Sequence, residues 1–314
     1  MKYSFVIIVY NEEENIKKCI ESIIVQKGLG TNYEILVVDD GSKDATASIV
    51  DGLAKYNKRI NIISDGGNHG RGYGRYIGVE RSKGEYICMV DGDILLPKTW
   101  LQSCLKHIIK YDVVGGIAVP DGDVAYIYRR FKLTPKVVAG STTITGNNGM
   151  YRRDIFFKVS FNKNLRDGED VDFNHRAQDA GISEFCIPGL TVEHQESKSF
   201  VTSMVWLYQS GVGATRQLLK FREIRLPDMS FAITFFCLIG AVILSIVTSF
   251  MVWLLAPVLC VLGASFLHTR GKFRIQLFNP RAIGAILTDA LLIISYYAGR
   301  SIGMLVYVTK ASDK

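Results

Sequence analysis

An uncharged run of 37 residues, from Phe231 to Leu267, restricts the possible folds of this chain more than any other feature. A single helix of that length would extend about 55 Å, whereas the hydrocarbon core of a membrane is about 30 Å thick. We therefore expect two membrane-spanning helices joined by a tight turn near Thr248 and Ser249. Pro257 lies inside the second helix, and membrane helices tolerate proline.

A third apolar stretch runs from about Ala282 to Val308 and contains Asp289 and Arg300. These two residues are 11 positions apart, about three helical turns, so they share one face of a helix. Because a charge is costly in lipid, this face is expected to meet protein. The stretch either crosses the membrane a third time or lies in the membrane interface.

The net charge of +7 belongs to the C-terminal part, because residues 216–314 hold 11 basic and four acidic residues while residues 1–215 are neutral. These basic residues flank the apolar runs, which favours a membrane surface over nucleic acid as their partner. If the first two runs form a hairpin, the flanking basic residues lie on one side, and the positive-inside rule assigns that side to the cytoplasm. The first apolar run of the chain is too short for a signal peptide, so we expect residues 1–215 in the cytoplasm as well.

The N-terminal part alternates short β-branched runs with helical stretches. The runs predicted to be strands are residues 5–9, 34–38, 60–63 and 85–90. Such alternation predicts βαβ units and a largely parallel sheet with helices on both faces. Sheets of this type bind ligands at the carboxyl ends of their strands.

Acidic loops follow two of these strands. The second strand ends at Asp39 and Asp40, and the fourth ends at Asp91-Gly92-Asp93. Two carboxylates separated by one residue can both approach a divalent cation on a diphosphate, and oxygen ligands suit Mg²⁺ or Mn²⁺. The alternative is a solvated turn, since Asp and Gly are common turn residues.

Four segments, in order, resemble motifs of the family 2 glycosyltransferases, which have the GT-A fold. The segments are Val6–Glu13, Val37–Thr46, Val90–Asp93 and Gly146–Arg153, with Gly168-Glu169-Asp170 behind the last. The resemblance covers about residues 3–200. It implies an α/β fold with a Rossmann-like mixed sheet, followed here by an α-helical membrane region.

Three domains are expected on this basis. Residues 1–215 form the GT-A glycosyltransferase domain, and residues 216–228 form a linker helix that lies on anionic headgroups. Residues 229–314 form a membrane region with two to three transmembrane helices.

On the donor side the resemblance implies roles for single residues. Tyr10 and Glu12 match the loop that contacts the nucleotide. Asp39 matches the acid that hydrogen-bonds the base, with Asp40 beside it. Asp91 corresponds to the acid near the ribose and the diphosphate.

The resemblance also implies a cation, Mn²⁺ or Mg²⁺. Asp93 corresponds to the metal ligand, and His194 lies where some relatives have a further metal or diphosphate contact. A lone histidine at a strand end is also commonly structural. Arg71 and Arg75 belong to a glycine-rich segment that leads into the donor-side helix and are available to the diphosphate, unless they are ordinary surface arginines.

Asp170 matches the general base of the family. Inverting transfer needs a carboxylate that removes the proton of the acceptor hydroxyl as this hydroxyl attacks the anomeric carbon. The start of a helix favours the ionised form of Asp170, although a simple surface charge is the alternative. Glu169, Asn147 and Asn148 are expected on the acceptor side, with a helix-capping turn as the alternative for the two asparagines.

The predicted function is a membrane-anchored, metal-dependent inverting glycosyltransferase. It would move a sugar from a nucleotide-sugar donor to a lipid-linked or glycan acceptor, as a multi-pass protein of the cell membrane with a cytoplasmic catalytic domain. A polyprenyl-phosphate glycosyltransferase is the close alternative, although the acid loop lacks the Asp-Ala-Asp-Leu-Gln form of dolichyl-phosphate mannose synthases. A non-catalytic membrane scaffold is a remote alternative, because the acids that match the family motifs are all present.

Overall fold

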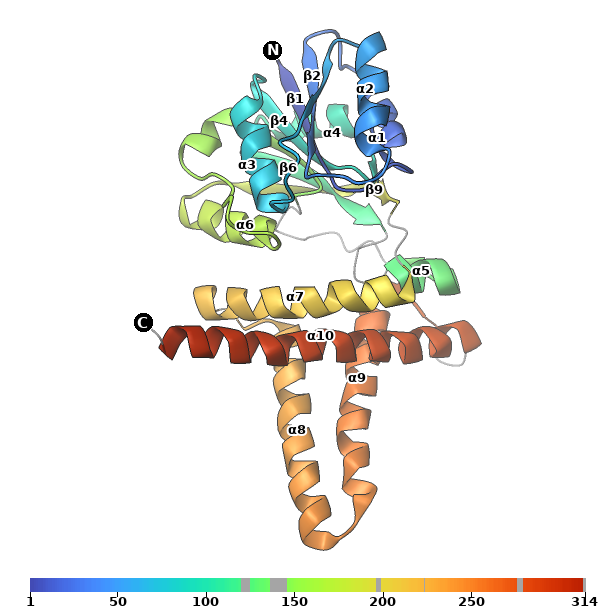
Figure 1. Ribbon diagram of the computed structural model, residues 1–314. Helices are drawn as coiled ribbons and strands as arrows, with labels where there is room; N and C mark the ends of the chain where they lie inside the picture. Colours follow the sequence, from blue (N-terminus) through green and yellow to red (C-terminus); the bar gives the residue numbers. More distant parts are fainter. Residues whose placement is uncertain (120–124, 136–145, 196–198, 223, 276–278, 313–314) are drawn as a thin grey trace. The chain divides into compact units, whose positions relative to one another are not determined.

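The computed structural model describes residues 1–314 except 120–124, 136–145, 196–198, 223, 276–278 and 313–314 (Figure 1). The chain divides into two compact units. Unit 1 comprises Met1–Asp121 and Val137–Glu196, and unit 2 comprises Gly122–Lys136 and Ser197–Lys314. The expected domain boundaries at residues 215 and 228 stay a prediction.

Unit 1 is built on an eight-stranded sheet with the order β3-β2-β1-β4-β8-β6-β9-β5. The strands are β1 (Tyr3–Val9), β2 (Tyr33–Asp39), β3 (Ile60–Ile63), β4 (Tyr86–Asp91), β5 (Ile94–Leu95), β6 (Val113–Val119), β8 (Asn148–Arg152) and β9 (Glu184–His194). Strands β1 to β4 are parallel, as expected from the alternation of strands and helices. Strand β8 is antiparallel to both of its neighbours, β4 and β6, so the complete sheet is mixed.

Helices cover both faces of this sheet (Figure 1). They are α1 (Ile16–Ile24), α2 (Thr46–Tyr56), α3 (Arg71–Arg81), α4 (Trp100–His107) and α6 (Glu169–Asp179), with a 3-10 helix over Arg153–Phe157. Side chains of a strand alternate between the faces, so Phe5 and Ile7 pack with α1, α2 and α4, while Val6 and Ile8 pack with α3 and α6. Helix α3 comes so close to β1 that a Cβ on Gly78 would overlap the side chain of Val6.

Unit 2 is helical, apart from a short antiparallel pair of β7 (Thr134–Pro135) and β10 (Phe273–Arg274). Its helices are α5 (Ala125–Phe131), α7 (Phe200–Phe221), α8 (Leu226–Thr248), α9 (Leu255–Lys272) and α10 (Pro280–Ser312), with a 3-10 helix over Met251–Leu254. Helices α8 and α9 form the expected hairpin, with Ser249 in the left-handed region at the turn (φ 58°). In the described part of the chain, three helices are long and apolar enough to cross a membrane: Leu226–Thr248, Met251–Lys272 and Pro280–Tyr307.

Asp289 and Arg300, the two charged residues within the apolar stretch of α10, are buried, which confirms that this face meets protein. Asp289 is 1% exposed, and its Oδ1 lies 3.0 Å from Nδ1 of His268 on α9. Arg300 is 0% exposed, and its Nη2 forms an ion pair with Asp228 on α8. Helix α10 therefore contacts both helices of the hairpin through buried polar groups.

Candidate active site

The strands of unit 1 bring several expected site residues to one edge of the sheet. Partners in the strand register are Val9 and Asp39, Ile8 and Asp91, Val90 and Asn148, and Ile94 and His194. The carboxyl ends of β1, β2, β4 and β9 therefore meet here, together with the first residue of the antiparallel strand β8. Parallel sheets place ligands at such an edge.

Asp93 and His194 are in direct contact at this edge. Oδ2 of Asp93 lies 2.9 Å from Nε2 of His194, and the two side chains are 16% and 13% exposed. The backbone N–H of Gln195 donates to the carbonyl oxygen of Asp93 at 2.8 Å, which fixes the loop against the end of β9. A carboxylate suits Mg²⁺ or Mn²⁺, and a histidine nitrogen is a common ligand of metal ions.

Glu12, in the loop after β1, is a further acid beside this pair. Burial and then the charge of Asp93 raise the pKa of Glu12 from 4.5 to about 7; Asp91 adds to this increase, and a hydrogen bond from Asn15 opposes it. A cation bound at this end of the sheet would relieve the mutual repulsion of these acids.

The residues at this edge fit a divalent cation that is shared with a substrate. Among the described residues, no three His, Cys, Asp or Glu side chains are grouped closely enough to hold a metal ion. Mg²⁺ and similar ions are commonly bound by one or two carboxylates together with substrate phosphates. Asp93 and His194 can therefore supply part of a coordination shell that a diphosphate completes.

A buried arginine joins the acidic loop to the start of α6. Arg75 is 1% exposed, and its Nη2 donates to Asp91 Oδ1 at 2.9 Å. Its Nε donates to Glu169 Oε1 at 2.9 Å, and its Nη1 donates to the carbonyl oxygen of Gly146. The structure thus places Arg75 between two carboxylates, and its expected contact with the diphosphate stays a prediction.

Asp170 lies in the first turn of α6, directly after Glu169. The helix begins behind Gly168, whose φ of 64° is one that glycine adopts without strain. Oδ1 of Asp170 accepts a hydrogen bond from the backbone N–H of Val171 at 2.8 Å. Its role as the general base stays a prediction.

The residues expected on the acceptor side have internal partners. Glu169 is 1% exposed, and burial raises its pKa although the charge of Arg75 opposes this. Asn148 is 0% exposed; its Oδ1 accepts from the N–H of Gly116 at 2.7 Å, and its Nδ2 donates to Asn147 Oδ1 at 2.9 Å. Their contact with an acceptor stays a prediction.

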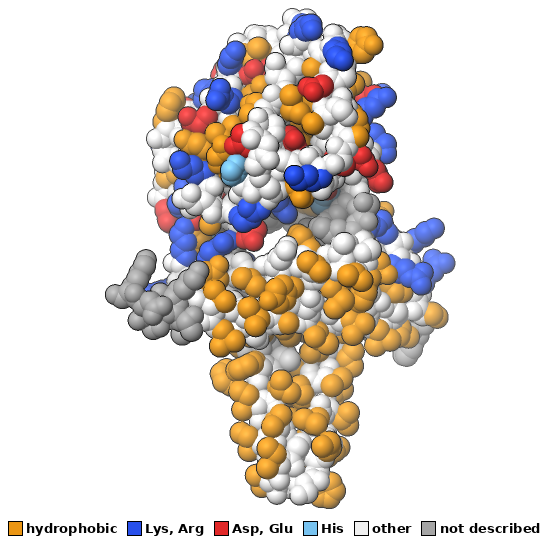
Figure 2. Space-filling view, viewed as in Figure 1, with side chains coloured by type: hydrophobic (Ala, Val, Ile, Leu, Met, Phe, Trp, Pro, Cys, Tyr) orange, Lys and Arg blue, Asp and Glu red, His pale blue; other side chains and the backbone are white. Residues whose placement is uncertain are grey.

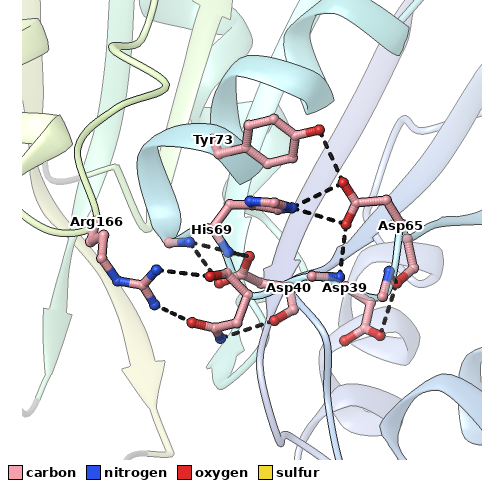
Figure 3. Close-up of polar contacts among 11 residues, drawn as sticks. Asp39, Asp40, Asp65, His69, Tyr73 and Arg166 are labelled. Carbon is pink, nitrogen blue, oxygen red and sulfur yellow. Dashed lines mark hydrogen bonds and ion pairs between the residues drawn. The ribbon is translucent and has the colours of Figure 1, made fainter.

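The two acids after β2 have different partners. The carboxylate of Asp40 accepts hydrogen bonds from the backbone N–H groups of His69 at 2.6 Å and Gly70 at 2.9 Å (Figure 3). Asp40 therefore holds the loop that leads into α3. Oδ1 of Asp39 accepts from the N–H of Ser42 at 3.1 Å, and its Oδ2 has a long 3.5 Å contact with Ser64.

The remaining expected donor residues, Tyr10 and Arg71, are exposed. Tyr10 is 47% exposed in the loop after β1, and Arg71 is the first residue of α3. Both elements begin at the carboxyl edge of the sheet, so the structure brings these side chains to the same edge as the acids.

A polar cluster beside Asp40 is not among the site residues expected from the sequence. Asp65 accepts from the hydroxyl of Tyr73 at 3.2 Å and lies 3.0 Å from Nε2 of His69 (Figure 3). Next to this group, Nη1 of Arg166 donates to the carbonyl oxygen of Asn68 at 2.8 Å. Asp65 follows β3, so the strand-end rule that selected the acids after β2 and β4 could have found it.

The family model described as Glycosyl transferase family 2 matches residues 4–164. Glycosyltransferase AglE of Haloferax volcanii is 31% identical over 190 residues, which cover 57% of this chain and 62% of that protein. An undecaprenyl-phosphate 4-deoxy-4-formamido-L-arabinose transferase of Shewanella sediminis is 26% identical over 202 residues, covering 58% of this chain and 61% of that protein. The chain therefore matches less than two thirds of the length of these relatives.

Solved structures share the fold at low sequence identity. Mannosyltransferase PcManGT of Pyrobaculum calidifontis, in complex with GDP-Man and Mn²⁺, has a TM-score of 0.60 at 16% identity and covers 95% of this chain and 86% of that chain. S. aureus TarS 1–349 with UDP-GlcNAc has a TM-score of 0.50 at 18% identity and covers 96% of this chain and 91% of that chain. These likenesses confirm the expected fold, a mixed α/β GT-A-like domain followed by a helical region.

Proposed function

Because the chain belongs to glycosyl transferase family 2, we propose that it transfers a sugar from a nucleotide-sugar donor to an acceptor hydroxyl, with inversion at the anomeric carbon. One observation carries this proposal. Arg75 connects the acidic loop after β4, through Asp91, to the start of α6, where Glu169 precedes Asp170. This connection supports a single site in which the acidic loop binds the diphosphate and a separate carboxylate, that of Asp170, removes the proton.

The donor side uses the acids at the strand ends. Asp39, at the end of β2, hydrogen-bonds the base, while Asp91 and Asp93 face the ribose and the diphosphate. Asp93 and His194 would hold Mn²⁺ or Mg²⁺, and the mannosyltransferase structure with Mn²⁺ supports this choice. When bound, the cation supplies charge stabilisation for the departing nucleoside diphosphate.

Asp170 acts as the general base. Its carboxylate takes the proton of the acceptor hydroxyl while the hydroxyl oxygen forms a bond to the anomeric carbon. The bond from that carbon to the diphosphate oxygen breaks, and the nucleoside diphosphate leaves with the electron pair. Arg75 keeps Glu169 in place, which positions the neighbouring Asp170 at the start of α6.

The acceptor is lipid-linked or a glycan, and transfer takes place at a membrane. Three candidate spanning helices support association with a membrane. Basic residues flank the apolar helices, which supports a cytoplasmic position for unit 1. The relative from Shewanella sediminis is named for undecaprenyl phosphate, which keeps a polyprenyl phosphate as the second candidate acceptor.

The direct test uses the purified full chain with a panel of UDP- and GDP-sugars and either Mn²⁺ or Mg²⁺. We expect one donor to release its nucleoside diphosphate in a cation-dependent reaction, and radiolabelled sugar to appear in an acceptor fraction. An alkali-stable, acid-labile lipid product would identify the polyprenyl-phosphate alternative. If no donor is bound, hydrolysed or transferred with either cation, the proposal is wrong.

A further inference from the structure

We propose that α10 does not cross the membrane but lies with α7 in the plane of the membrane interface, so that only the α8–α9 hairpin crosses. The exposed apolar face of α10 then contacts the lipid at the boundary between headgroups and acyl chains. Two crossings return the chain to the side on which it entered, and the C-terminus lies on that side. This inference rests on the proposed membrane association and not on the enzymatic activity.

Helices α7 and α10 lie side by side and run in the same direction (Figure 1). The hydroxyl of Ser295 donates to the carbonyl oxygen of Met204 at 2.7 Å, and about three turns further along α7 the hydroxyl of Thr215 donates to the carbonyl oxygen of Arg300 at 3.2 Å. Between these contacts, a Cβ on Gly299 would overlap the backbone of α7. Such close packing along both helices means that they lie at the same depth in any membrane.

Helix α7 is poorly suited to cross a membrane. In the described part of the chain it is not among the helices that are long and apolar enough to do so. It carries Gln209, Arg216, Gln217 and Lys220 within 22 residues. Polar and charged side chains inside the hydrocarbon of a bilayer are costly. Because α10 shares the depth of α7, a crossing by α10 would carry these polar groups into the hydrocarbon.

The buried ion pair and the His–Asp contact of α10 lie at the open end of the hairpin. Arg300 pairs with Asp228 in the first turn of α8, and Asp289 contacts His268 in the last turns of α9. Tyr297 packs edge to face on Phe231, 17 residues before the end of α8, and Val261 of α9 belongs to the same apolar cluster, 12 residues after Ser249 in the turn. About 26 Å of α8 and about 18 Å of the α9 side of the hairpin therefore extend beyond these contacts. These lengths are most of the roughly 30 Å of the hydrocarbon core, which fits α10 resting about 5–10 Å into the boundary, as interfacial helices do.

The exposed side chains of unit 2 agree with this placement. Figure 2 shows apolar side chains over the hairpin, where Ile246, Val247 and Met251 at the turn are 74–78% exposed. Helix α10 presents a single apolar stripe along its length, which is typical of a helix that rests in the interface. The stripe consists of Ile283, Leu287, Leu291, Ile294, Ile302 and Leu305, all 42–64% exposed.

Reporter tags on the full chain test this topology. Each tag is placed at the N-terminus, after Ser249 in the turn, or after Lys314, and its side is read by protease protection in sealed membrane vesicles. We expect the N-terminal and C-terminal tags on one side and the tag after Ser249 on the other. A C-terminal tag opposite the N-terminal tag would mean that α10 crosses, and a turn tag on the same side as both ends would mean that the hairpin does not. Either result overturns the proposal, whatever the enzymatic activity.

Spin labels provide a second measurement that does not depend on a tag. Leu287 and Leu305 are 18 residues apart on α10, about 27 Å along the helix. In nanodiscs, labels at these positions are expected to lie at equal depth, as judged by their accessibility to oxygen and to a water-soluble nickel complex. Labels at Ile233 and Ile246 of α8 are the matched control and should differ in depth. Unequal depths at Leu287 and Leu305 would contradict the proposal.

Discussion

Arg75 and Glu169 form a buried ion pair, with Nε of the guanidinium 2.9 Å from Oε1 of the carboxylate. The two side chains are 2% and 1% exposed, although the residues are 94 positions apart in the sequence. Because Arg75 also pairs with Asp91, one cation connects the donor-side acid to the residue that precedes the proposed base. The site therefore depends on Arg75, a residue that has no proposed contact with the sugar.

Replacing Arg75 with methionine is expected to destabilise unit 1. Two carboxylates would lose their buried partner, and breaking a buried pair in this way costs about 3–5 kcal/mol. Chemical denaturation of the purified chain in detergent measures the loss. The double variant Arg75→Met/Glu169→Gln should recover part of it, because the unpaired charge of Glu169 is removed.

The matched control is Arg81→Met, six residues later at the exposed end of α3. We expect a change of less than about 0.5 kcal/mol, as for most surface substitutions. Equal effects of the two substitutions would contradict the structural role of Arg75.

Glu12 makes the stability of the cation-free protein depend on pH. Its folded-state pKa is raised to about 7 from an ordinary value of 4.5, so its charged form is disfavoured in the fold. The stability that the protonated form contributes is complete below pH 4.5 and is lost as the pH rises to about 7. The loss in the free energy of unfolding is on the order of 2 kcal/mol. Each pKa unit corresponds to about 1.36 kcal/mol, and the partial exposure of the side chain reduces the total.

Thermal unfolding between pH 4.5 and 8, with and without Mn²⁺, tests this prediction. The wild type should lose more stability than Glu12→Gln over this range, and Mn²⁺ should reduce the difference. Identical pH profiles for the two proteins would show that the carboxyl of Glu12 does not titrate in this range.

Substitution of Asp93 or His194 with alanine should weaken cation-dependent nucleotide binding by at least about tenfold, as loss of one ligand commonly does. Isothermal titration of the matching nucleoside diphosphate in the presence of Mn²⁺ measures the effect. Asp154→Ala is the control, because Asp154 pairs with Arg152 at the opposite end of β8. Unchanged binding after both site substitutions would remove the proposed cation site.

The packing of α7 on α10 can be tested with two alanine substitutions. A Cβ on Gly299 would overlap the carbonyl oxygen of Tyr208, whereas a Cβ on Gly240 of α8 would meet nothing within 4 Å. Gly299→Ala is expected to cost about 1–3 kcal/mol through overpacking, and Gly240→Ala should be neutral or stabilising. Thermal stability in detergent distinguishes them, and similar values would contradict the close contact.

The parallel half of the sheet could be predicted because its strands are local β-branched runs separated by helices. The pairing of the other strands, which makes the sheet mixed, could not be predicted. Strand β8 (Asn148–Arg152) begins with Asn-Gly, typical of a turn, and β9 contains Pro188 and Gly189. Their pairing with β4 and β6 comes from contacts distant in the sequence, which local propensity does not encode.

The acids after β2 and β4 were found from strand ends, and the family resemblance named Arg75 and His194 beside them, but the contacts that join these residues could not be predicted. Arginine on a helix is usually exposed, so the burial of Arg75 could not be inferred without Glu169, which lies 94 residues later. The high pKa of Glu12 likewise depends on how the loop after β1 packs beside Asp93. For α10, the apolar pattern allowed both a crossing and an interfacial helix, and the proposal of an interfacial helix rests on contacts with α7 that the sequence does not show.

The roles of Asp170 and the acidic loop can be separated by one substitution with a control on the same helix. Asp170→Asn keeps the size and position of the side chain but removes its basicity, so donor binding should persist. Asp179→Asn, at the exposed end of α6, should leave transfer and binding unchanged.

The most direct measurement is single-turnover sugar transfer by Asp170→Asn, with its donor affinity measured in parallel. The expected result is a loss of transfer by about a factor of 10³ or more, within the range that general base catalysis provides, at an almost unchanged Kd for the donor. Transfer close to the wild-type rate by Asp170→Asn would contradict the assignment of the base, and with it the central claim that acids at one edge of the sheet divide the tasks of holding the leaving group and removing the proton.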